Sequence, residues 1–277
     1  MPDYTSCYVN ADGIKTHYLE SGNRNRPPVV LIHGGGAGAD AMGNWRHVMP
    51  QLAQDFYIVA PDMVGFGKTE KPCTDGYRYS QSARNDHLAS FIKALGLNTP
   101  ALVGNSMGGA TALGVAMAHP EMVGKLVLMG SAGLNSEITE ELKPIIYYDF
   151  TRDGMRRLIK ALTGSRFIIT DDLVDFRYKM SIDPDTRRAY EKVMACIRED
   201  GGLAYKEDDI ARVKTPTLVV NGKQDLVVPL KNAYRFLELL DNSWGYFIPH
   251  CGHWAMIEAA DDFTHITRAF LLSEGGV

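Results

Sequence analysis

Short apolar runs alternate with longer segments of helical periodicity along most of the chain. The first two runs, residues 6–10 and 14–19, flank Asp12-Gly13, a pair typical of a tight turn between antiparallel strands. Residues 28–32 then form a continuous apolar run that ends at a cluster of glycines. A run of this kind is typical of a strand that is buried on both faces of a parallel sheet.

The same pattern continues through the C-terminal part of the chain. Further apolar runs predict strands at residues 56–60, 101–104, 126–129, 217–220 and 245–248. The clearest helical patterns lie between them, at residues 80–95, 110–118 and 232–240. Because strands that alternate with helices form right-handed βαβ units, we predict an α/β fold with a mostly parallel, eight-stranded sheet flanked by helices.

The alternation is interrupted between residues 133 and 206. This segment shows helical patterns and no clear strand, and it is too long for a simple loop. We therefore predict that residues 133–206 form a helical lid, inserted between the two parts of a core domain at residues 1–132 and 207–277.

Composition and charge exclude several classes of partner. Of the 277 residues, 45% are hydrophobic and 22% are charged, as in ordinary globular proteins with a large core. The formal net charge of −4 gives no reason to expect binding to nucleic acid or to an anionic membrane. Since no apolar stretch is long enough to span a membrane and the N-terminus does not resemble a signal peptide, we predict a cytoplasmic protein.

The sequence also lacks the patterns of common metal and cofactor sites. The four cysteines are scattered without the spacing of zinc ligands, which favours free thiols in a reducing compartment. No Walker A or dinucleotide-binding glycine motif follows a first strand. We therefore predict neither a metal nor a cofactor.

Residues 104–108, Gly-Asn-Ser-Met-Gly, match the motif G-x-S-x-G. The motif stands between a predicted strand and a predicted helix, which is the context of a nucleophile elbow. Such a sharp turn requires small residues two positions before and after the serine, and both of these positions are glycines. The pattern predicts that Ser106 is a nucleophile and that the chain has the α/β-hydrolase fold.

A serine nucleophile needs a histidine base, and in this fold class the histidine comes last along the chain. Only His250, His253 and His265 follow the predicted insertion. We favour His253, because Gly252 allows the loop before it to turn sharply and reach over the sheet. His250 is the rival base, although it directly follows a strand that it could simply cap. His265 lies in a helical stretch and is interpreted as a surface residue.

The acid that orients the histidine should follow the strand at residues 217–220. Asp225 lies in the loop that leaves the carboxyl end of this strand, where parallel sheets place their chemistry. A structural turn aspartate would have the same local pattern, and Asp241 is a second candidate one helix later. We predict that Asp225 is the acid.

An oxyanion hole requires two backbone N–H groups that point at the reacting carbonyl oxygen. Met107, directly after the nucleophile, should supply one of them. Gly35 should supply the other, since residues 33–36, His-Gly-Gly-Gly, resemble the corresponding element of esterases. His33 itself is interpreted as structural.

Beyond these general motifs, the chain resembles the meta-cleavage product hydrolases over nearly its whole length. These enzymes are the carbon–carbon bond hydrolases of the α/β-hydrolase superfamily. The most specific matches are Asn44, Asn105 directly before the nucleophile, and Trp254 directly after the histidine. The pattern is most similar to hydrolases of carbazole, dibenzofuran and biphenyl catabolism.

The resemblance implies a substrate and a mechanism. The substrate would be a 2-hydroxy-6-oxohexa-2,4-dienoate with an aryl group at C6, a small molecule formed when a catechol ring is opened. The dienolate would be ketonised at C5 with the help of His253, and Ser106 would then attack the C6 carbonyl. Cleavage of the C5–C6 bond and hydrolysis of the acyl-enzyme would give a 2-hydroxypentadienoate and a carboxylic acid.

The resemblance also implies a binding site for the polar end of the dienoate, formed by Asn44, Asn105, Arg177 and Trp254. An arginine suits a carboxylate because its two N–H groups can pair with both oxygens. The alternative for Arg177 is an exposed arginine on the lid. We further predict a homo-oligomer, a dimer or a tetramer.

Two other functions stay open at this point. A carboxylesterase for small aromatic esters would use the same acyl-enzyme, and a ligand receptor on a hydrolase fold could retain the same three side chains. A single polar pocket formed by Asn44, Arg177 and Trp254 would favour the carbon–carbon hydrolase over the esterase. Multiple turnover would exclude the receptor.

Overall fold

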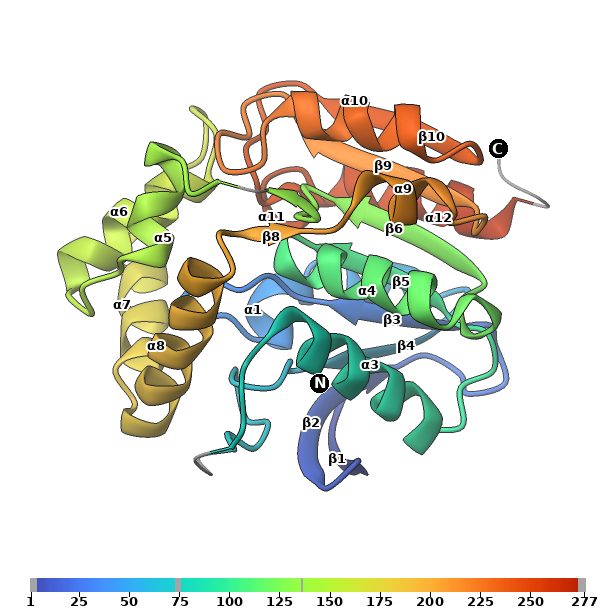
Figure 1. Cartoon of the computed structure of the whole chain (residues 1–277), viewed down its shortest axis with the longest axis horizontal. Coiled ribbons are helices and arrows are strands. Elements are labelled where there is room, and N and C mark those ends of the chain that lie inside the picture. Colours follow the sequence, from blue (N-terminus) through green and yellow to red (C-terminus); the bar gives the residue numbers. More distant parts are fainter. Residues whose placement is uncertain (1–3, 73–75, 136, 274–277) are drawn as a thin grey trace.

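The computed structural model describes residues 4–72, 76–135 and 137–273 (Figure 1). Its centre is an eight-stranded sheet with the strand order β1-β2-β4-β3-β5-β6-β9-β10. The pairs β1–β2 and β2–β4 are antiparallel, and all other neighbours in this sheet are parallel. The strands are β1 (Thr5–Ala11), β2 (Ile14–Ser21), β3 (Pro28–Ile32), β4 (Tyr57–Pro61), β5 (Ala101–Asn105), β6 (Lys125–Met129), β9 (Thr217–Gly222) and β10 (Ser243–Ile248).

Each apolar run identified in the sequence lies within or overlaps one of these strands. The predicted turn between the first two strands is also present, with positive φ angles of 51° at Asp12 and 84° at Gly13. The central strands β3 and β4 are almost entirely buried, as expected for strands covered on both faces.

Helices cover both faces of the sheet. In Figure 1, α3, α4 and α9 lie in front of the sheet, α1, α11 and α12 lie behind it, and α10 lies along its upper edge beside β9 and β10. The core helices are α1 (Ala41–Trp45), α2 (Met49–Leu52), α3 (Gln81–Ala94), α4 (Met107–Ala118), η1 (Pro120–Met122), α9 (Glu207–Ala211), α10 (Leu230–Leu239), α11 (Ala255–Glu258) and α12 (Ala260–Leu272). Helix α4 directly follows β5 and is buried over most of its length, so it fixes the position of the loop between them.

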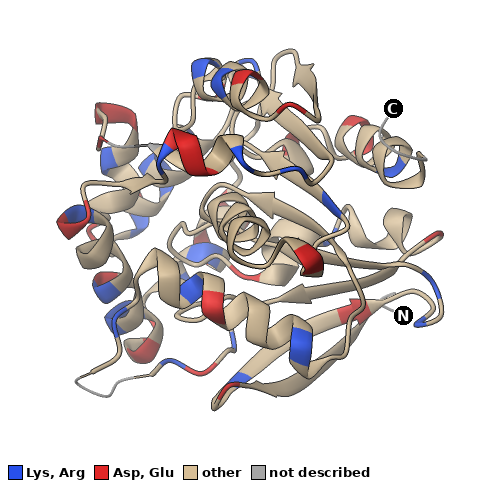
Figure 2. Ribbon diagram, turned by 45° about the vertical axis from the view of Figure 1, so that its right-hand side comes forward, with Lys and Arg blue, Asp and Glu red and all other residues tan. Residues whose placement is uncertain are grey.

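A group of helices stands to one side of the sheet, on the left of Figure 1. It comprises η2 (Glu140–Leu142), α5 (Lys143–Ile146), α6 (Arg152–Leu162), α7 (Asp171–Ser181) and α8 (Pro184–Glu199). Lysines and arginines alternate with acidic residues along these helices (Figure 2). The helices lie within the predicted lid segment, although the domain boundaries themselves stay a prediction.

The expectation that this segment contains no strand was wrong. Strands β7 (Leu134–Asn135) and β8 (Leu203–Ala204) pair in an antiparallel ladder near its two ends. Strands of two residues are too short to produce a period-two pattern, so the sequence could not reveal them.

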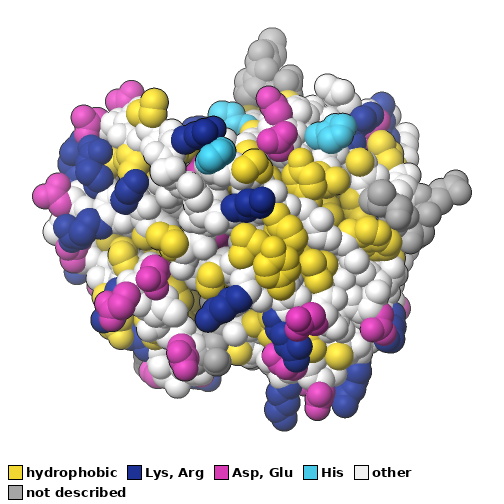
Figure 3. Space-filling model, turned by 90° about the horizontal axis from the view of Figure 1, so that it is seen from above, with side chains coloured by type: hydrophobic (Ala, Val, Ile, Leu, Met, Phe, Trp, Pro, Cys, Tyr) yellow, Lys and Arg dark blue, Asp and Glu magenta, His cyan; other side chains and the backbone are white. Residues whose placement is uncertain are grey.

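The surface near α10 carries exposed aromatic and aliphatic side chains. Tyr234 of α10 packs against Phe247 of β10, with 5.0 Å between the ring centroids, and Leu226 is exposed in the preceding loop. Viewed from above, this side of the molecule shows hydrophobic side chains gathered near its centre (Figure 3). None of the helices in the described ranges is long and apolar enough to cross a membrane. Cys7, Cys196 and Cys251 are unpaired, and Cys73 lies outside the described residues.

Candidate active site

Ser106 occupies the turn between β5 and α4. Its backbone has φ 57° and ψ −122°, a conformation that is strained for any residue with a side chain. A Cβ atom at Gly104 would lie 2.5 Å from the carbonyl oxygen of Gly108, and one at Gly108 would lie 2.4 Å from two other carbonyl oxygens. Only glycines fit these two positions, which is the packing that the sequence motif predicts.

A histidine and an aspartate form a buried pair near this turn. The Nδ1 atom of His253 lies 2.7 Å from Oδ2 of Asp225, and both side chains are buried. The other oxygen of Asp225 accepts hydrogen bonds from the backbone N–H groups of Val227 (2.9 Å) and Val228 (2.8 Å). This aspartate therefore holds the imidazole with Nδ1 protonated, which leaves Nε2 as the acceptor. His253 and Ser106 line the same cavity.

The rival residues lie elsewhere on the described surface. His250 and His265 are exposed, and His250 adopts a positive φ of 57° directly after β10. Asp241 is exposed and forms an ion pair with Lys214 at 2.9 Å. None of these residues lines the cavity that contains Ser106.

Backbone N–H groups are available on two sides of the serine. Met107 is the first residue of α4, and an N–H at this position has no acceptor within its own helix. Gly35 lines the cavity beside it, since a Cβ atom there would lie 2.7 Å from Cε of Met107. His33 does not face the cavity: its Nδ1 donates to the Gly34 carbonyl at 2.7 Å, and its Nε2 accepts the N–H of Met63 at 2.9 Å.

Arg177 is a buried cation in the wall of this cavity. It comes from α7, is only 3% exposed, and lies 4.8 Å from the ring centroid of Trp254. Its Nη2 donates to the Ala37 carbonyl at 2.9 Å, whereas its Nε has no hydrogen-bond partner among the described residues. Burial lowers the pKa of Arg177 to about 10, and the nearby carboxylate of Asp40 partly opposes this shift. Arg177 is therefore not the exposed lid arginine that the sequence left as an alternative.

Two asparagines line the same cavity. Asn44 is carried by α1, whose N-terminus is capped by Asp40 through a 2.7 Å bond to the Gly43 N–H. Asn105 donates from Nδ2 to the carbonyls of Met129 (3.2 Å) and His253 (3.4 Å). The buried Oδ1 of Asn105 has no partner in the described part of the chain, so it can accept a hydrogen bond from a ligand.

The rest of the cavity wall is mainly apolar and comes largely from the lid segment. Sequence reasoning did not single out these residues, because they carry only the general apolar periodicity of helices. The larger apolar side chains are Ile138, Leu142, Ile145, Ile146, Leu162, Met194, Ile197, Leu203, Val227 and Val228. Glu137 and the small residues Gly34, Gly36, Ala39, Ala132 and Gly202 also line the cavity. Within the described ranges, no group of three or more histidine, cysteine or acidic residues is arranged to hold a metal ion.

Known proteins match the chain over nearly its whole length. A family model for the α/β hydrolase fold matches residues 27–260. The chain is 55% identical over 269 residues to the 2-hydroxy-6-oxo-6-(2′-aminophenyl)hexa-2,4-dienoic acid hydrolase of Metapseudomonas resinovorans, covering 97% of this chain and 91% of that protein. It is 37% identical to the 2-hydroxy-6-oxo-2,4-heptadienoate hydrolase of Pseudomonas putida, with 96% of each chain covered.

Solved structures give the same result. A serine hydrolase involved in carbazole degradation has a TM-score of 0.88 and 52% identity, with 97% of this chain and 98% of that chain covered. A meta-cleavage product hydrolase from Pseudomonas fluorescens IP01 has a TM-score of 0.90 and 35% identity, with 96% and 97% covered. The predicted fold and the family resemblance are therefore confirmed. The chain belongs to the α/β-hydrolase fold family and, within it, to the meta-cleavage product hydrolases, which are enzymes that hydrolyse a carbon–carbon bond.

Proposed function

We propose that this enzyme hydrolyses the C5–C6 bond of a 2-hydroxy-6-oxohexa-2,4-dienoate that carries an aryl group at C6. The observation that carries the proposal is Arg177, a buried cation that lines the same cavity as Ser106. A buried charge is costly unless its hydrogen-bonding groups are satisfied, and the Nε of Arg177 has no partner among the described residues, so an anionic ligand is the natural complement of this side chain. The carboxylate of the dienoate supplies that anion.

The polar end of the substrate would be held by groups that have free hydrogen-bonding capacity. Arg177 would pair with the carboxylate through its Nε and the adjacent guanidinium N–H groups. In the bound dienol, the unpartnered Oδ1 of Asn105 would accept the hydrogen bond of the 2-hydroxyl group before His253 removes that proton, and Asn44 would bind a second oxygen of the same end. The ring of Trp254 would help to position the guanidinium through a cation–π contact.

We assign the proton transfers to His253. Its Nε2 would take the proton of the 2-hydroxyl group and deliver it to C5, which converts the dienol into the 2,6-diketone. Asp225 stabilises the imidazolium that forms between these two transfers.

Ser106 would then attack the C6 carbonyl while His253 accepts the hydroxyl proton. The N–H groups of Met107 and Gly35 would stabilise the oxyanion. The C5–C6 bond breaks as the oxyanion collapses, and its electron pair passes through C5 into a dienolate. The imidazolium of His253 would return the proton that it took from Ser106 to the 2-oxygen of this dienolate, which gives the 2-hydroxypentadienoate and the neutral imidazole. Water then hydrolyses the acyl-enzyme, releasing the aromatic carboxylic acid after the 2-hydroxypentadienoate has left.

The apolar part of the cavity supports an aryl group at C6. Once Arg177 holds the carboxylate and Ser106 contacts C6, the C6 substituent has to pack against the remaining wall, which is mainly aliphatic. The relative from Metapseudomonas resinovorans is named for an aminophenyl substrate, which is consistent with this assignment.

A carboxylesterase for small aromatic esters is the alternative, because it would use the same acyl-enzyme. A neutral ester gives Arg177 nothing to bind, so the buried cation favours the dienoate. A ligand receptor on this fold would bind the dienoate without repeated turnover.

The test is the variant Arg177→Gln, measured with two substrates. A buried charge-assisted hydrogen bond contributes about 1.5–3 kcal/mol, so we expect kcat/KM for the dienoate to fall roughly 10- to 150-fold. Hydrolysis of p-nitrophenyl benzoate should change far less and serves as the internal control. Equal losses with both substrates would assign Arg177 a structural role and would contradict the proposed carboxylate site.

The remaining expectations stay predictions. Only the sequence supports the cytoplasmic location and the lid boundaries at residues 133 and 206. The same holds for the homo-oligomer, whether dimer or tetramer. The dienoate is the proposed small-molecule partner.

A further inference from the structure

The C-terminal end of the lid helix α6 contacts both loops that hold the proposed histidine and its acid. The backbone N–H of His253 donates to the carbonyl of Leu162, the last residue of α6, at 3.0 Å. The backbone N–H and the hydroxyl of Ser165 both donate to Oε1 of Gln224, at 2.9 and 3.0 Å. Because Gln224 directly precedes Asp225, the end of α6 is bonded to the neighbourhood of both side chains.

A single carboxylate, that of Glu258, joins these segments. Its Oε2 accepts the backbone N–H of Gly164 at 2.7 Å, directly beyond the end of α6. The N–H of Gly252 donates to both carboxylate oxygens, at 3.1 and 3.2 Å, and the N–H of Trp254 donates to Oε1 at 3.2 Å. Gly252 and Trp254 flank His253 on either side, so the carboxylate binds the loop at both neighbours of the histidine.

The two glycines make this arrangement possible. A Cβ atom at Gly252 would lie 2.4 Å from the backbone nitrogen of Gly164, and one at Gly164 would lie 2.9 Å from the backbone nitrogen of Gly252. The two backbones therefore pack directly against each other, and their N–H groups reach the same carboxylate. Burial raises the pKa of Glu258 above its ordinary value, although the N–H groups of Gly164, Gly252 and Trp254 and the nearby His253 act to lower it.

Glu258 has no other part in the proposed chemistry. It comes from the end of α11, does not line the cavity, and does not bond the imidazole ring. An ionised carboxylate can accept all of these hydrogen bonds at once, whereas a neutral amide of the same size presents a single acceptor oxygen and an NH₂ group that repels backbone N–H groups. The charge of Glu258 is therefore what allows it to hold the lid and the histidine loop together.

We propose that Glu258 is a positioning residue, which clamps the end of lid helix α6 to the loop of His253 and so fixes the imidazole relative to Ser106. The proposal rests on the proposed roles of Ser106 and His253. It does not depend on the dienoate, because any reaction that requires the imidazole to activate the serine should respond to the loss of the clamp.

The experiment compares Glu258→Gln with Asp262→Asn in the full-length enzyme. Asp262 is exposed on α12 four residues further along, so its substitution removes a nearby negative charge without touching the clamp. For Glu258→Gln we expect kcat for dienoate cleavage to fall about 10- to 100-fold, because small displacements of a catalytic group are costly, while KM stays within about twofold. Asp262→Asn should leave both parameters unchanged.

A second readout removes the dependence on the substrate. The rate at which a fluorophosphonate labels Ser106 should fall in Glu258→Gln by a factor similar to the loss of kcat. Amide hydrogen exchange should become faster in residues 162–166 and in residues 251–254 together. Labelling of the wild type at Ser106 tests the proposed nucleophile separately, so a failure of the clamp is distinguishable from a failure of the proposed function.

Three results would overturn the proposal. They are an unchanged kcat and labelling rate in a folded Glu258→Gln variant, a change confined to KM, and faster exchange in only one of the two segments. If Glu258→Gln does not fold, Glu258→Asp keeps the charge on a shorter side chain and carries the same comparison. For the Asp variant, a wild-type kcat and labelling rate together with slow exchange in both segments would support the clamp. A wild-type kcat and labelling rate with faster exchange would contradict it.

Discussion

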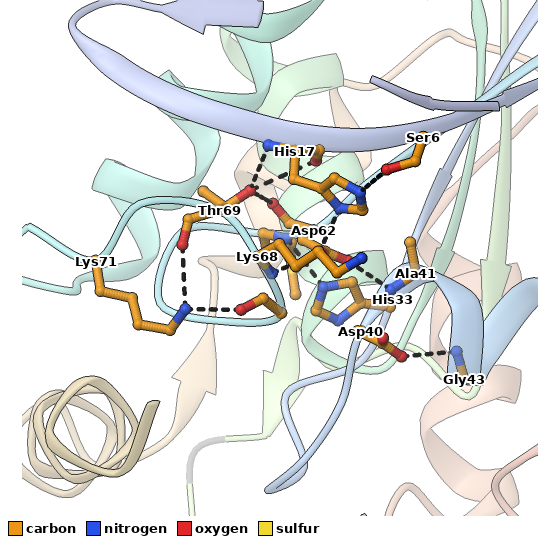
Figure 4. Close-up of polar contacts among 12 residues, drawn as sticks. Ser6, His17, His33, Asp40, Ala41, Gly43, Asp62, Lys68, Thr69 and Lys71 are labelled. Carbon is orange, nitrogen blue, oxygen red and sulfur yellow. Dashed lines mark hydrogen bonds and ion pairs between the residues drawn. The ribbon is translucent and has the colours of Figure 1, made fainter. Parts of the chain in front are cut away.

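Two regions of this molecule bring together a serine, a histidine and an aspartate. In one of them, Nε2 of His17 lies 2.8 Å from Oγ of Ser6, and Nδ1 of His17 lies 2.7 Å from Oδ2 of Asp62 (Figure 4). In the other, His253 is bonded to Asp225 at the same distance of 2.7 Å and shares a cavity with Ser106. Both imidazoles therefore bond an aspartate through Nδ1, although only the second region has the surroundings of a catalytic site.

The difference lies in the backbone around each serine. Ser6 lies on the extended edge strand β1 with an exposed side chain, whereas Ser106 occupies a strained turn at the N-terminus of α4. Successive N–H groups of an extended strand point in opposite directions and cannot converge on one oxyanion, whereas Met107 at the start of α4 offers a free N–H beside Gly35. An array of serine, histidine and aspartate therefore does not make the serine a nucleophile unless the strained turn, the N–H groups and the cavity are present as well.

Asp62 shows what the first array does instead. Its carboxylate also accepts the backbone N–H groups of Ala41 and Lys68, both at 2.8 Å. Burial acts to raise the pKa of Asp62, but the bond from His17 and the charge and N–H groups nearby outweigh it and lower the pKa. Asp62 thereby ties the end of β4 to the start of α1, which carries Asn44, and to the following loop (Figure 4).

The largest expected difference is between two single variants, in which either Ser106 or Ser6 is replaced by alanine. Ser106→Ala should lower the rate of product formation from the dienoate on the order of 10⁶-fold, since no other group can form the acyl-enzyme. Ser6→Ala should stay within about twofold of the wild type. Product quantification by liquid chromatography checks both variants, and a large loss in Ser6→Ala would show that the two regions are not distinct in function.

Substitution of the two aspartates should affect two different quantities, kcat in the case of Asp225 and the free energy of unfolding in the case of Asp62. Asp225→Asn should lower kcat roughly 10⁴-fold, because the imidazole loses the carboxylate that fixes its tautomer. Asp62→Asn should lower the free energy of unfolding by about 3 kcal/mol, as expected when a buried charge-assisted network is broken, while the folded fraction stays active. Urea unfolding and kinetics on the same preparations measure both quantities, and the opposite pattern would reverse the assignment of the two arrays.

The smallest effect concerns His87, a buried histidine that bonds the hydroxyl of Thr16 at 2.8 Å and has no carboxylate partner in the described residues. Burial lowers the pKa of His87 from its ordinary 6.5 to about 4. Because the unfolded chain takes up this proton at higher pH than the folded chain, the contribution is fully present above pH 6.5 and is lost as the pH falls toward 4. The loss should reach at most about 3 kcal/mol.

The matched variant for this effect is His87→Gln, whose amide can still bond Thr16. The free energy of unfolding of the wild type should fall more steeply between pH 6.5 and 4.5 than that of the variant. Parallel pH dependences in the two proteins would show that His87 does not resist protonation.

Much of the sheet and of the elbow could be predicted because their signals are local. The apolar runs of the central strands and the glycines around Ser106 are consequences of burial and of steric contact that any chain with this turn must satisfy. The contact between His253 and Asp225 joins residues 28 positions apart, and the order of motifs along the chain was enough to anticipate it.

Other features depend on contacts between distant segments and leave no local signal. The apolar wall supplied by the lid looks like any amphipathic helix surface, and the strands β7 and β8 are too short to show a period. The clamp at Glu258 joins residues 94 positions apart through backbone N–H groups, which no side-chain pattern can reveal. The burial of Arg177 likewise depends on the packing of α7 against the loop that contains Ala37, which is distant in the sequence.

The most direct test of the central claim is a stopped-flow reaction of the wild-type enzyme with 2-hydroxy-6-oxo-6-phenylhexa-2,4-dienoate, combined with identification of the products. The proposed function predicts loss of the visible chromophore over many turnovers, with 2-hydroxypentadienoate and benzoate formed in equal amounts. A stable chromophore in the presence of an enzyme that readily hydrolyses p-nitrophenyl benzoate would contradict carbon–carbon bond hydrolysis of this substrate class and would favour the esterase.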